Sequence, residues 1–228
     1  MDGSPPHAAP ARPAPLLPPE APGEAALLGR AVPATAGPTG DGVAGTRSRP
    51  LVVAALVVVA AAALVLRFWT RSDLWLDEAL TVDIARQPLH ELPTYLRRDG
   101  APPLYYALLH VWMGMFGTSD LAVRSLSGVV GVVTVPCAWL AGRRIGGTTA
   151  AWAAALLVAT SPFAVRYDTE TRMYALVALL TVLGFLALAR TLDRPRPGNL
   201  AAVAVVTAAL LYSHYWSLYL LGVTGLWL

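Results

Sequence analysis

An adjacent pair of carboxylates, Asp77 and Glu78, lies in the segment Leu-Trp-Leu-Asp-Glu-Ala-Leu-Thr shortly after a long apolar run. Carboxylates close to hydrocarbon lose hydration, which raises their pKa and suits them to proton abstraction. The same two residues could instead begin a helix, with Asp77 as its N-cap and Glu78 in its first turn. The two roles are compatible, because a carboxylate held at a helix start is also well oriented.

A second acidic candidate, Asp99, precedes the segment Gly-Ala-Pro-Pro-Leu-Tyr-Tyr. The two prolines, Pro102 and Pro103, each fix a φ angle and exclude their predecessor from the helical region. We therefore expect a rigid turn that holds Asp99 near the membrane surface and starts a helix. An ordinary turn-forming Asp would have the same sequence.

The third candidate is the segment Arg-Tyr-Asp-Thr-Glu-Thr-Arg-Met-Tyr between two apolar runs, at a membrane boundary. Arginines on the outer face of a membrane need a partner, and a phosphate accepts hydrogen bonds from the planar guanidinium. This predicts a phosphate site at Arg166 and Arg172. The alternative is internal pairing at i, i+4 spacing, Arg166 with Glu170 or Asp168 with Arg172. The remaining binding candidates of this segment are Tyr167 and Tyr174.

His214 is a lone ionisable residue among Tyr212, Tyr215 and Trp216. Aromatic belts at membrane interfaces explain such rings, and the histidine remains a candidate hydrogen-bond donor. Arg124, at the start of another apolar run, is expected to extend to the lipid head groups.

These motifs belong to an integral membrane protein, since 56% of the 228 residues are hydrophobic and only 14% charged. Every basic residue is Arg, and Ala, Gly and Pro are frequent, which indicates a GC-rich bacterial genome. The arginines are scattered, so we expect no nucleic-acid partner. The single cysteine, Cys137, excludes a disulfide framework and a cysteine-based metal site, and we expect no structural metal.

Residues 1–49 are rich in Pro and Ala and contain no aromatic residue, which predicts a disordered cytoplasmic tail. Residues 50–228 form the membrane domain, an all-α bundle. We expect transmembrane helices at about 51–68, 121–141, 148–165, 173–189, 199–213 and 216–228, and a structured extracytoplasmic loop over 69–120. The chain ends inside an apolar run, which we interpret as the end of a fragment.

The segment 104–116 is apolar and aromatic but short for a span, and charge decides its placement. If it lies in the outer interface, two arginine clusters fall in cytoplasmic loops, Arg143 and Arg144 in one and Arg190, Arg194 and Arg196 in the other. If it spans, both clusters move outside. We therefore predict an interfacial helix, a cytoplasmic N-terminus and an extracytoplasmic site in a bacterial plasma membrane.

The order of these motifs resembles the N-terminal part of polyprenyl-phosphate-dependent GT-C glycosyltransferases. The similarity is to the glycosyltransferase family 39-like group, which includes protein O-mannosyltransferases and aminoarabinose transferases. The family's catalytic base, the Asp of the first-loop Asp-Glu pair, corresponds to Asp77. Further matching segments are Pro102 to Leu104, Arg172 to Tyr174 with Glu170 before it, and His214-Tyr215.

The resemblance implies transfer of mannose or another hexose or pentose from a polyprenyl-phosphate donor to a protein, lipid or glycan acceptor, with inversion at the anomeric carbon. Arg166 or Arg172 would stabilise the leaving phosphate. Adjacent helical side chains point about 100° apart, so Glu78 would not share the hydroxyl bound by Asp77 but would orient a partner or bind a divalent cation.

The sequence departs from the family pattern in two ways, one that concerns the substrate and one that concerns the number of helices. No Lys lies near Pro102, where aminoarabinose transferases have one, and family members continue through more helices. A secondary transporter and a non-catalytic membrane scaffold are the alternative functions. The acidic residues of this chain lie in loops at one face and no halves repeat, which favours the transferase.

Overall fold

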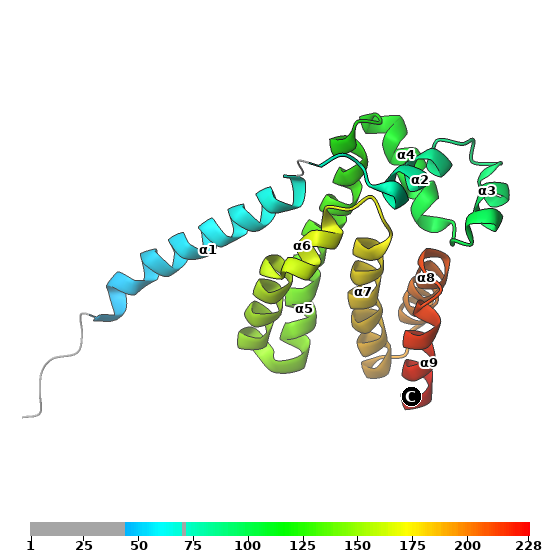
Figure 1. Ribbon diagram of the computed structural model, residues 1–228. Helices are drawn as coiled ribbons and strands as arrows, with labels where there is room; N and C mark the ends of the chain where they lie inside the picture. Colours follow the sequence, from blue (N-terminus) through cyan, green and yellow to red (C-terminus); the bar gives the residue numbers. More distant parts are fainter. Residues whose placement is uncertain (1–43, 70–71) are drawn as a thin grey trace, which may run out of the picture. The chain divides into compact units, whose positions relative to one another are not determined.

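The structure is a computed structural model that describes residues 44–69 and 72–228, without the side chains of 44–53, 55 and 56. Every described element is a helix (Figure 1). In chain order they are α1 (Ala44–Phe68), α2 (Leu76–Ala85), α3 (Leu92–Asp99), α4 (Leu104–Phe116), α5 (Asp120–Thr160), α6 (Pro162–Asp168), α7 (Tyr174–Asp193), α8 (Pro197–Ser213) and α9 (Ser217–Trp227). The predicted all-α fold is confirmed.

Helix α1 begins at Ala44, before the predicted start of the apolar run at Leu51. Residues 44–49, the last part of the predicted tail, belong to this helix. The prediction of disorder for residues 1–43 lies outside the described part of the chain.

Helix α5 contains the run predicted at 121–141 and most of the run predicted at 148–165, and it folds back on itself (Figure 1). The turn lies at Gly146 and Gly147, where Gly147 has a φ of 73° that only glycine adopts without strain. At Gly142 the two segments pack so closely that a Cβ would meet the carbonyl oxygen of Ala150 at 2.5 Å. The glycines thus make a tight helical hairpin.

The second segment of this hairpin ends at Thr160, earlier than the predicted 165. Pro162 forces Ser161 into an extended conformation, and a new helix, α6, starts at the proline. The Ser161 hydroxyl caps α6 by accepting from the Ala164 amide at 3.4 Å. Because of this break, Arg166 and Asp168 lie on the separate short helix α6.

The predicted structured loop between α1 and α5 is confirmed as three short helices, and α4 has the predicted bounds. α4 packs on α2 and α5, and its buried face includes Tyr105, Tyr106 and Leu109. They join a core with Val123 of α5 and Leu176 of α7. The loop helices are therefore fixed to the bundle.

The last turn of α1 is tied to the bundle by Arg67, which is 1% exposed. Its Nε donates to Asp168 at 2.8 Å, and its terminal nitrogens donate to the carbonyl oxygens of Val158 and Ala159 at the end of the α5 hairpin. Gly131 of α5 lies against the Asp168 carboxylate with no room for a side chain. A buried arginine and a glycine together dock α1.

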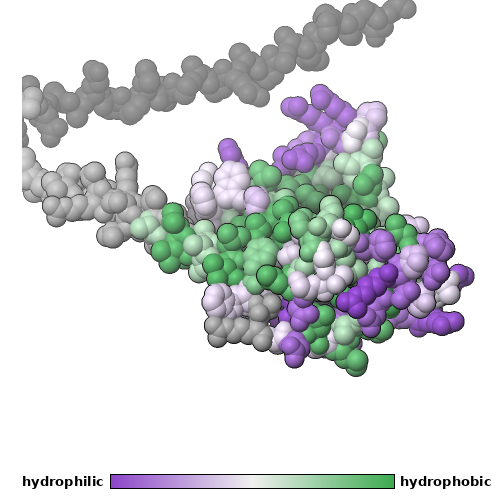
Figure 2. Space-filling view, turned by 90° about the horizontal axis from the view of Figure 1, so that it is seen from above, coloured by the Kyte–Doolittle hydropathy of each residue, from purple (hydrophilic) through white to green (hydrophobic). Residues whose placement is uncertain are grey.

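Two described helices, α5 and α7, are long and apolar enough to cross a membrane by length and composition. The predicted spans at 199–213 and 216–228 correspond to α8 with 17 residues and α9 with 11, and both helices are shorter than α7, which has 20. Hydrophobic side chains reach the surface between hydrophilic clusters (Figure 2). Exposed apolar residues such as Leu157, Val205 and Val223 suit a lipid environment.

We predict that Gly131→Ala destabilises the protein by about 1 to 3 kcal/mol, the usual cost of overpacking a core. The added methyl group would displace Asp168 and break its ion pair with Arg67. The matched control is Gly184→Ala on α7, whose Cβ would meet the nearest atom at an ordinary 3.4 Å. Thermal unfolding in detergent measures both. Equal melting temperatures for the two variants would contradict the docking of α1 through this contact.

Candidate active site

Helix α2 places the two candidate carboxylates in its first turn. Its N-cap is Trp75, in an extended conformation, so the prediction that Asp77 is the N-cap is wrong. Glu78 caps the helix instead, because its carboxylate accepts from the Trp75 amide at 3.3 Å. Asp77 lies one residue before Glu78, with its side chain 45% exposed.

Glu78 is completely buried and forms an ion pair with Arg124 of α5. Two guanidinium nitrogens of Arg124 donate to the Glu78 carboxylate, at 3.0 and 2.6 Å. The expectation that Arg124 extends to lipid head groups is therefore wrong, since it is 4% exposed and also donates to the carbonyl oxygens of Ser72 and Asp73. The arginine has stronger partners inside the protein.

The backbone amide of Thr171 donates to the same carboxylate at 2.7 Å. Burial alone would raise the pKa of Glu78, but the hydrogen bonds from Arg124 and Thr171 outweigh it and hold the pKa below its usual range. Glu78 is thus a charged group with every oxygen engaged. It joins α2, α5 and the segment between α6 and α7.

This junction brings Arg172 against Asp77. A terminal nitrogen of Arg172 lies 3.9 Å from the Asp77 carboxylate, while another donates to the Asp77 carbonyl at 3.3 Å and to the Thr81 hydroxyl at 3.0 Å. The alternative pairing of Asp168 with Arg172 is wrong, because Asp168 is held by Arg67. Among the described residues, two buried polar atoms here have no partner, Arg172 Nε and Thr171 Oγ1. Unsatisfied buried donors beside a carboxylate are suited to a polar ligand.

Asp99 ends α3 and accepts a hydrogen bond from the Tyr106 hydroxyl at 3.0 Å. Burial and the nearby Asp99 carboxylate raise the pKa of Tyr106 to about 12, so this hydroxyl stays protonated. The tyrosine also interacts with Thr81. Asp99 is therefore connected to the Arg172 group through Tyr106 instead of contacting it.

Arg166 and Glu170 form the predicted i, i+4 ion pair at 3.1 Å, with the Arg166 side chain 72% exposed. They line a polar cavity of about 310 Å³ together with Trp69, Ser72, Trp75, Glu78, Arg124 and Thr169. Burial raises the pKa of Glu170, and the charge of Glu78 adds to the rise, while Arg166 opposes it. Internal pairing is present at Arg166, yet its guanidinium remains open to an anion.

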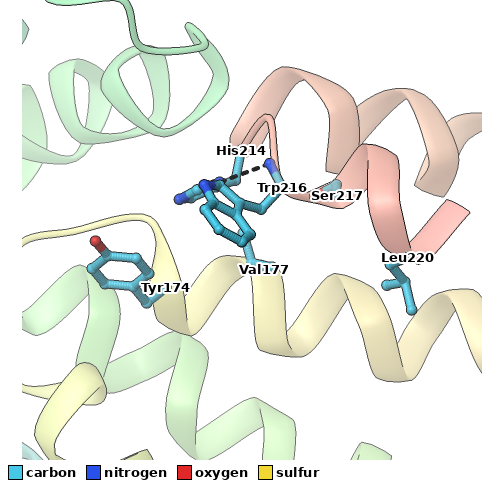
Figure 3. Close-up of a pocket in the computed structure, with 6 residues that line it drawn as sticks. All are labelled: Tyr174, Val177, His214, Trp216, Ser217 and Leu220. Atoms are coloured by element: carbon cyan, nitrogen blue, oxygen red, sulfur yellow. Dashed lines mark hydrogen bonds between the residues drawn. The ribbon is translucent and has the colours of Figure 1, made fainter.

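The predicted aromatic candidates lie in one row. Tyr167 and Tyr174 meet edge to face with ring centres 4.7 Å apart, and Tyr174 lies 5.9 Å from the His214 ring. His214 Nδ1 accepts from the Trp216 amide at 3.1 Å, so this nitrogen is not the expected donor. Burial and the positive charge of Arg172 lower the pKa of His214, which keeps the ring neutral. Tyr174, His214 and Trp216 line an apolar pocket between α7 and α9, which Tyr167 does not reach (Figure 3).

The site also contains residues that the sequence analysis did not single out, Thr81 and Thr171. Their signal was weak, since a threonine beside a charged motif is common. In the described part of the chain, no group of three or more His, Cys, Asp or Glu residues could hold a metal ion. A divalent cation near Glu78 would have to compete with Arg124 for the carboxylate, and it remains a prediction.

The sequence profile described as dolichyl-phosphate-mannose-protein mannosyltransferase matches residues 100–227, more than half of the chain. The match covers Arg124, Arg166, Arg172 and His214, and begins after Asp77 and Glu78. No curated protein and no solved structure gives a significant match. The chain therefore belongs to the dolichyl-phosphate-mannose-protein mannosyltransferase family, membrane glycosyltransferases of the GT-C type.

Proposed function

We propose that this glycosyltransferase moves a sugar, mannose or another hexose or pentose, from a polyprenyl-phosphate donor to a hydroxyl of an extracytoplasmic protein, lipid or glycan. One observation carries the proposal. Asp77, a half-exposed carboxylate, lies 3.9 Å from Arg172, whose Nε has no partner. A base next to an anion-binding group is what displacement of a phosphate by a hydroxyl requires.

In this mechanism Asp77 takes the proton of the acceptor hydroxyl as its oxygen bonds to the anomeric carbon. The bond from that carbon to the phosphate oxygen breaks, and the phosphate leaves with the electron pair. Arg172 stabilises the growing negative charge on the phosphate by a charge-assisted hydrogen bond. A single displacement from the opposite face inverts the anomeric carbon.

The base is Asp77 and not Glu78, because the two neighbours lie in different environments. Glu78 is buried, has a lowered pKa and gives its oxygens to Arg124, Thr171 and Trp75. A carboxylate in that state has no access to an acceptor. Glu78 therefore acts as a positioning residue that holds Asp77 and the Arg172 segment together.

We further propose that the site faces the outside of a bacterial plasma membrane, with a cytoplasmic N-terminus. The hairpin turn of α5 and the link from α7 to α8 lie at the end of the bundle away from α2 and α4 (Figure 1). Five arginines belong to these two connections, Arg143, Arg144, Arg190, Arg194 and Arg196, and Arg144 pairs with Asp193 there. The positive-inside rule supports the placement of this end in the cytoplasm.

Membership of a transferase family favours this function over a secondary transporter or a non-catalytic scaffold. The geometry adds to this, because the charged residues of the site, Asp77 and Glu78 with Arg124 and Arg172, gather at one end of the bundle. Transporter sites lie near the midplane, between repeated halves.

The test of the proposed base is Asp77→Asn in the membrane-embedded enzyme. Asn fills the same space but takes no proton at neutral pH, so transfer from a radiolabelled polyprenyl-phosphate sugar should fall by roughly 10² or more. The melting temperature should stay near that of the parent, since the Asp77 side chain makes only a long contact with Arg172. The matched control is Asp83→Asn on the same helix, an exposed residue that pairs with Arg86. Near-parental transfer by Asp77→Asn would show that another group is the base.

The orientation predicts which positions an impermeant thiol reagent reaches in intact cells. In a background with Cys137 replaced, a cysteine at Thr169 should react, whereas cysteines at Gly147 and Gly198 should react only after the membrane is opened. Reaction at Gly147 or Gly198 in intact cells would place the arginine-rich end outside and would refute the extracytoplasmic site.

A further inference from the structure

The two adjacent tyrosines in the first turn of α4, Tyr105 and Tyr106, have no role in the mechanism described above. Each is 1% exposed, and their rings meet edge to face with centres 6.5 Å apart. Phenylalanine would bury the same rings without a hydroxyl group to desolvate. The partners of the two hydroxyl groups therefore indicate what the tyrosines do.

The Tyr105 hydroxyl is connected to the main chain of Arg172. It lies 3.0 Å from the Ser127 hydroxyl of α5, which donates to the carbonyl oxygen of Arg172 at 3.3 Å. Because the single hydrogen of Ser127 goes to this carbonyl, the Tyr105 hydroxyl is the donor toward Ser127. Burial raises the pKa of Tyr105 above its ordinary value, so the hydroxyl keeps the proton that it donates.

The Tyr106 hydroxyl is connected to the side chain of the same arginine. It donates to Asp99 at 3.0 Å and interacts with Thr81. The Thr81 hydroxyl oxygen accepts from a terminal nitrogen of Arg172 at 3.0 Å, and its hydrogen goes to the Asp77 carbonyl oxygen at 2.7 Å. Thr81 is thus the link between Tyr106 and the guanidinium of Arg172.

The contact with Thr81 fixes the orientation of the Arg172 guanidinium. One terminal nitrogen gives its hydrogens to the Thr81 hydroxyl and to the Asp77 carbonyl oxygen, which sets the plane of the group. Nε lies in the same plane and is buried, and it has no partner in the part of the chain that the structure describes. A donor held in this way binds an anion without first losing conformational freedom.

We propose that Tyr105 and Tyr106 are positioning residues of the anion site, which fix the main chain and the guanidinium of Arg172 and so hold its Nε–H in place for the phosphate. The inference rests on the proposed function, because it assumes that Arg172 binds the donor phosphate. The helix that carries the pair starts after Pro102 and Pro103. The Pro-Pro segment therefore sets the position of the two tyrosines.

The alternative is that the tyrosines only fill the core where α4 packs on α2 and α5 (Figure 1). A packing role predicts that loss of a hydroxyl weakens anion binding by the same factor whether Arg172 is present or not. A positioning role predicts that the hydroxyl affects binding only when Arg172 is present. A double-mutant cycle separates the two roles.

The test titrates farnesyl phosphate, a prenyl monophosphate, against the detergent-solubilised parent, Tyr106→Phe, Arg172→Gln and the double variant. We expect Tyr106→Phe to weaken binding about tenfold when Arg172 is present and less than about twofold when it is replaced. Tyr105→Phe should behave in the same way. The control is Tyr95→Phe, the same change at an exposed position of α3, which should bind like the parent.

A second pair of variants changes the link itself. Thr81→Ser keeps the hydroxyl and should bind farnesyl phosphate like the parent, whereas Thr81→Val removes it and should bind about as weakly as Tyr106→Phe. This pair also replaces Tyr106→Phe in the cycle if that variant does not fold, as judged by its melting temperature. Equal binding by the serine and valine variants would refute the link through Thr81.

Two results of the cycle would overturn the proposal in distinguishable ways. Equal weakening by Tyr106→Phe with and without Arg172 would show that the tyrosine supports the fold and does not act through the arginine. If Arg172→Gln bound farnesyl phosphate as tightly as the parent, Arg172 would not be the group that binds the phosphate. The leaving-group role in the proposed function would then fail together with this inference.

Discussion

The buried ion pair between Glu78 and Arg124 is the interaction on which the site depends. Burying two charges is expensive, and the cost is recovered only when their hydrogen bonds are complete. Here Arg124 donates hydrogen bonds to Glu78 and to two carbonyl oxygens before α2. Glu78 also accepts a hydrogen bond from the Thr171 amide. The pair therefore fixes the start of α2, the start of α5 and the segment after α6 in one arrangement. Asp77 and Arg172 meet because each is the chain neighbour of a residue in this junction.

Arg172 acts electrostatically on residues of two pockets of opposite character. On one side, its charge acts on Glu170, which lines the polar cavity with Arg166. On the other side, it acts on His214, which lines the apolar pocket.

The sequence predicted which segments form helices better than it predicted the contacts between those helices. The apolar runs and the Pro-Pro segment located most helices, and α4 has the predicted bounds, because these features are local. The break at Ser161 was also local, since Pro162 encodes it, and it was missed because the apolar run continues to Val165. A helix end that is set by a single proline is easily overlooked when hydrophobic residues continue past it.

The arginine partners could not be predicted in the same way. Arg124 is 46 residues from Glu78, and Arg67 is 101 residues from Asp168, so no spacing rule relates them. The i, i+4 rule found the exposed pair of Arg166 and Glu170 but gave a false pair for Asp168 and Arg172. A buried charge selects its partner by three-dimensional position, and lone arginines in apolar runs were the only sign that such partners exist.

The most direct test of this account is a double-mutant cycle on Glu78 and Arg124, with thermal unfolding and sugar transfer measured for Glu78→Gln, Arg124→Met and the double variant. Each single change leaves a buried charge without its partner, so each should cost about 3 to 5 kcal/mol of stability and abolish transfer. The double variant leaves no unpaired charge and should be more stable than the sum of the single effects, by roughly 0.5 to 3 kcal/mol of coupling. If Glu78→Gln instead kept parental stability while losing transfer, Glu78 would act in the chemistry itself, and the positioning role of the ion pair would be refuted.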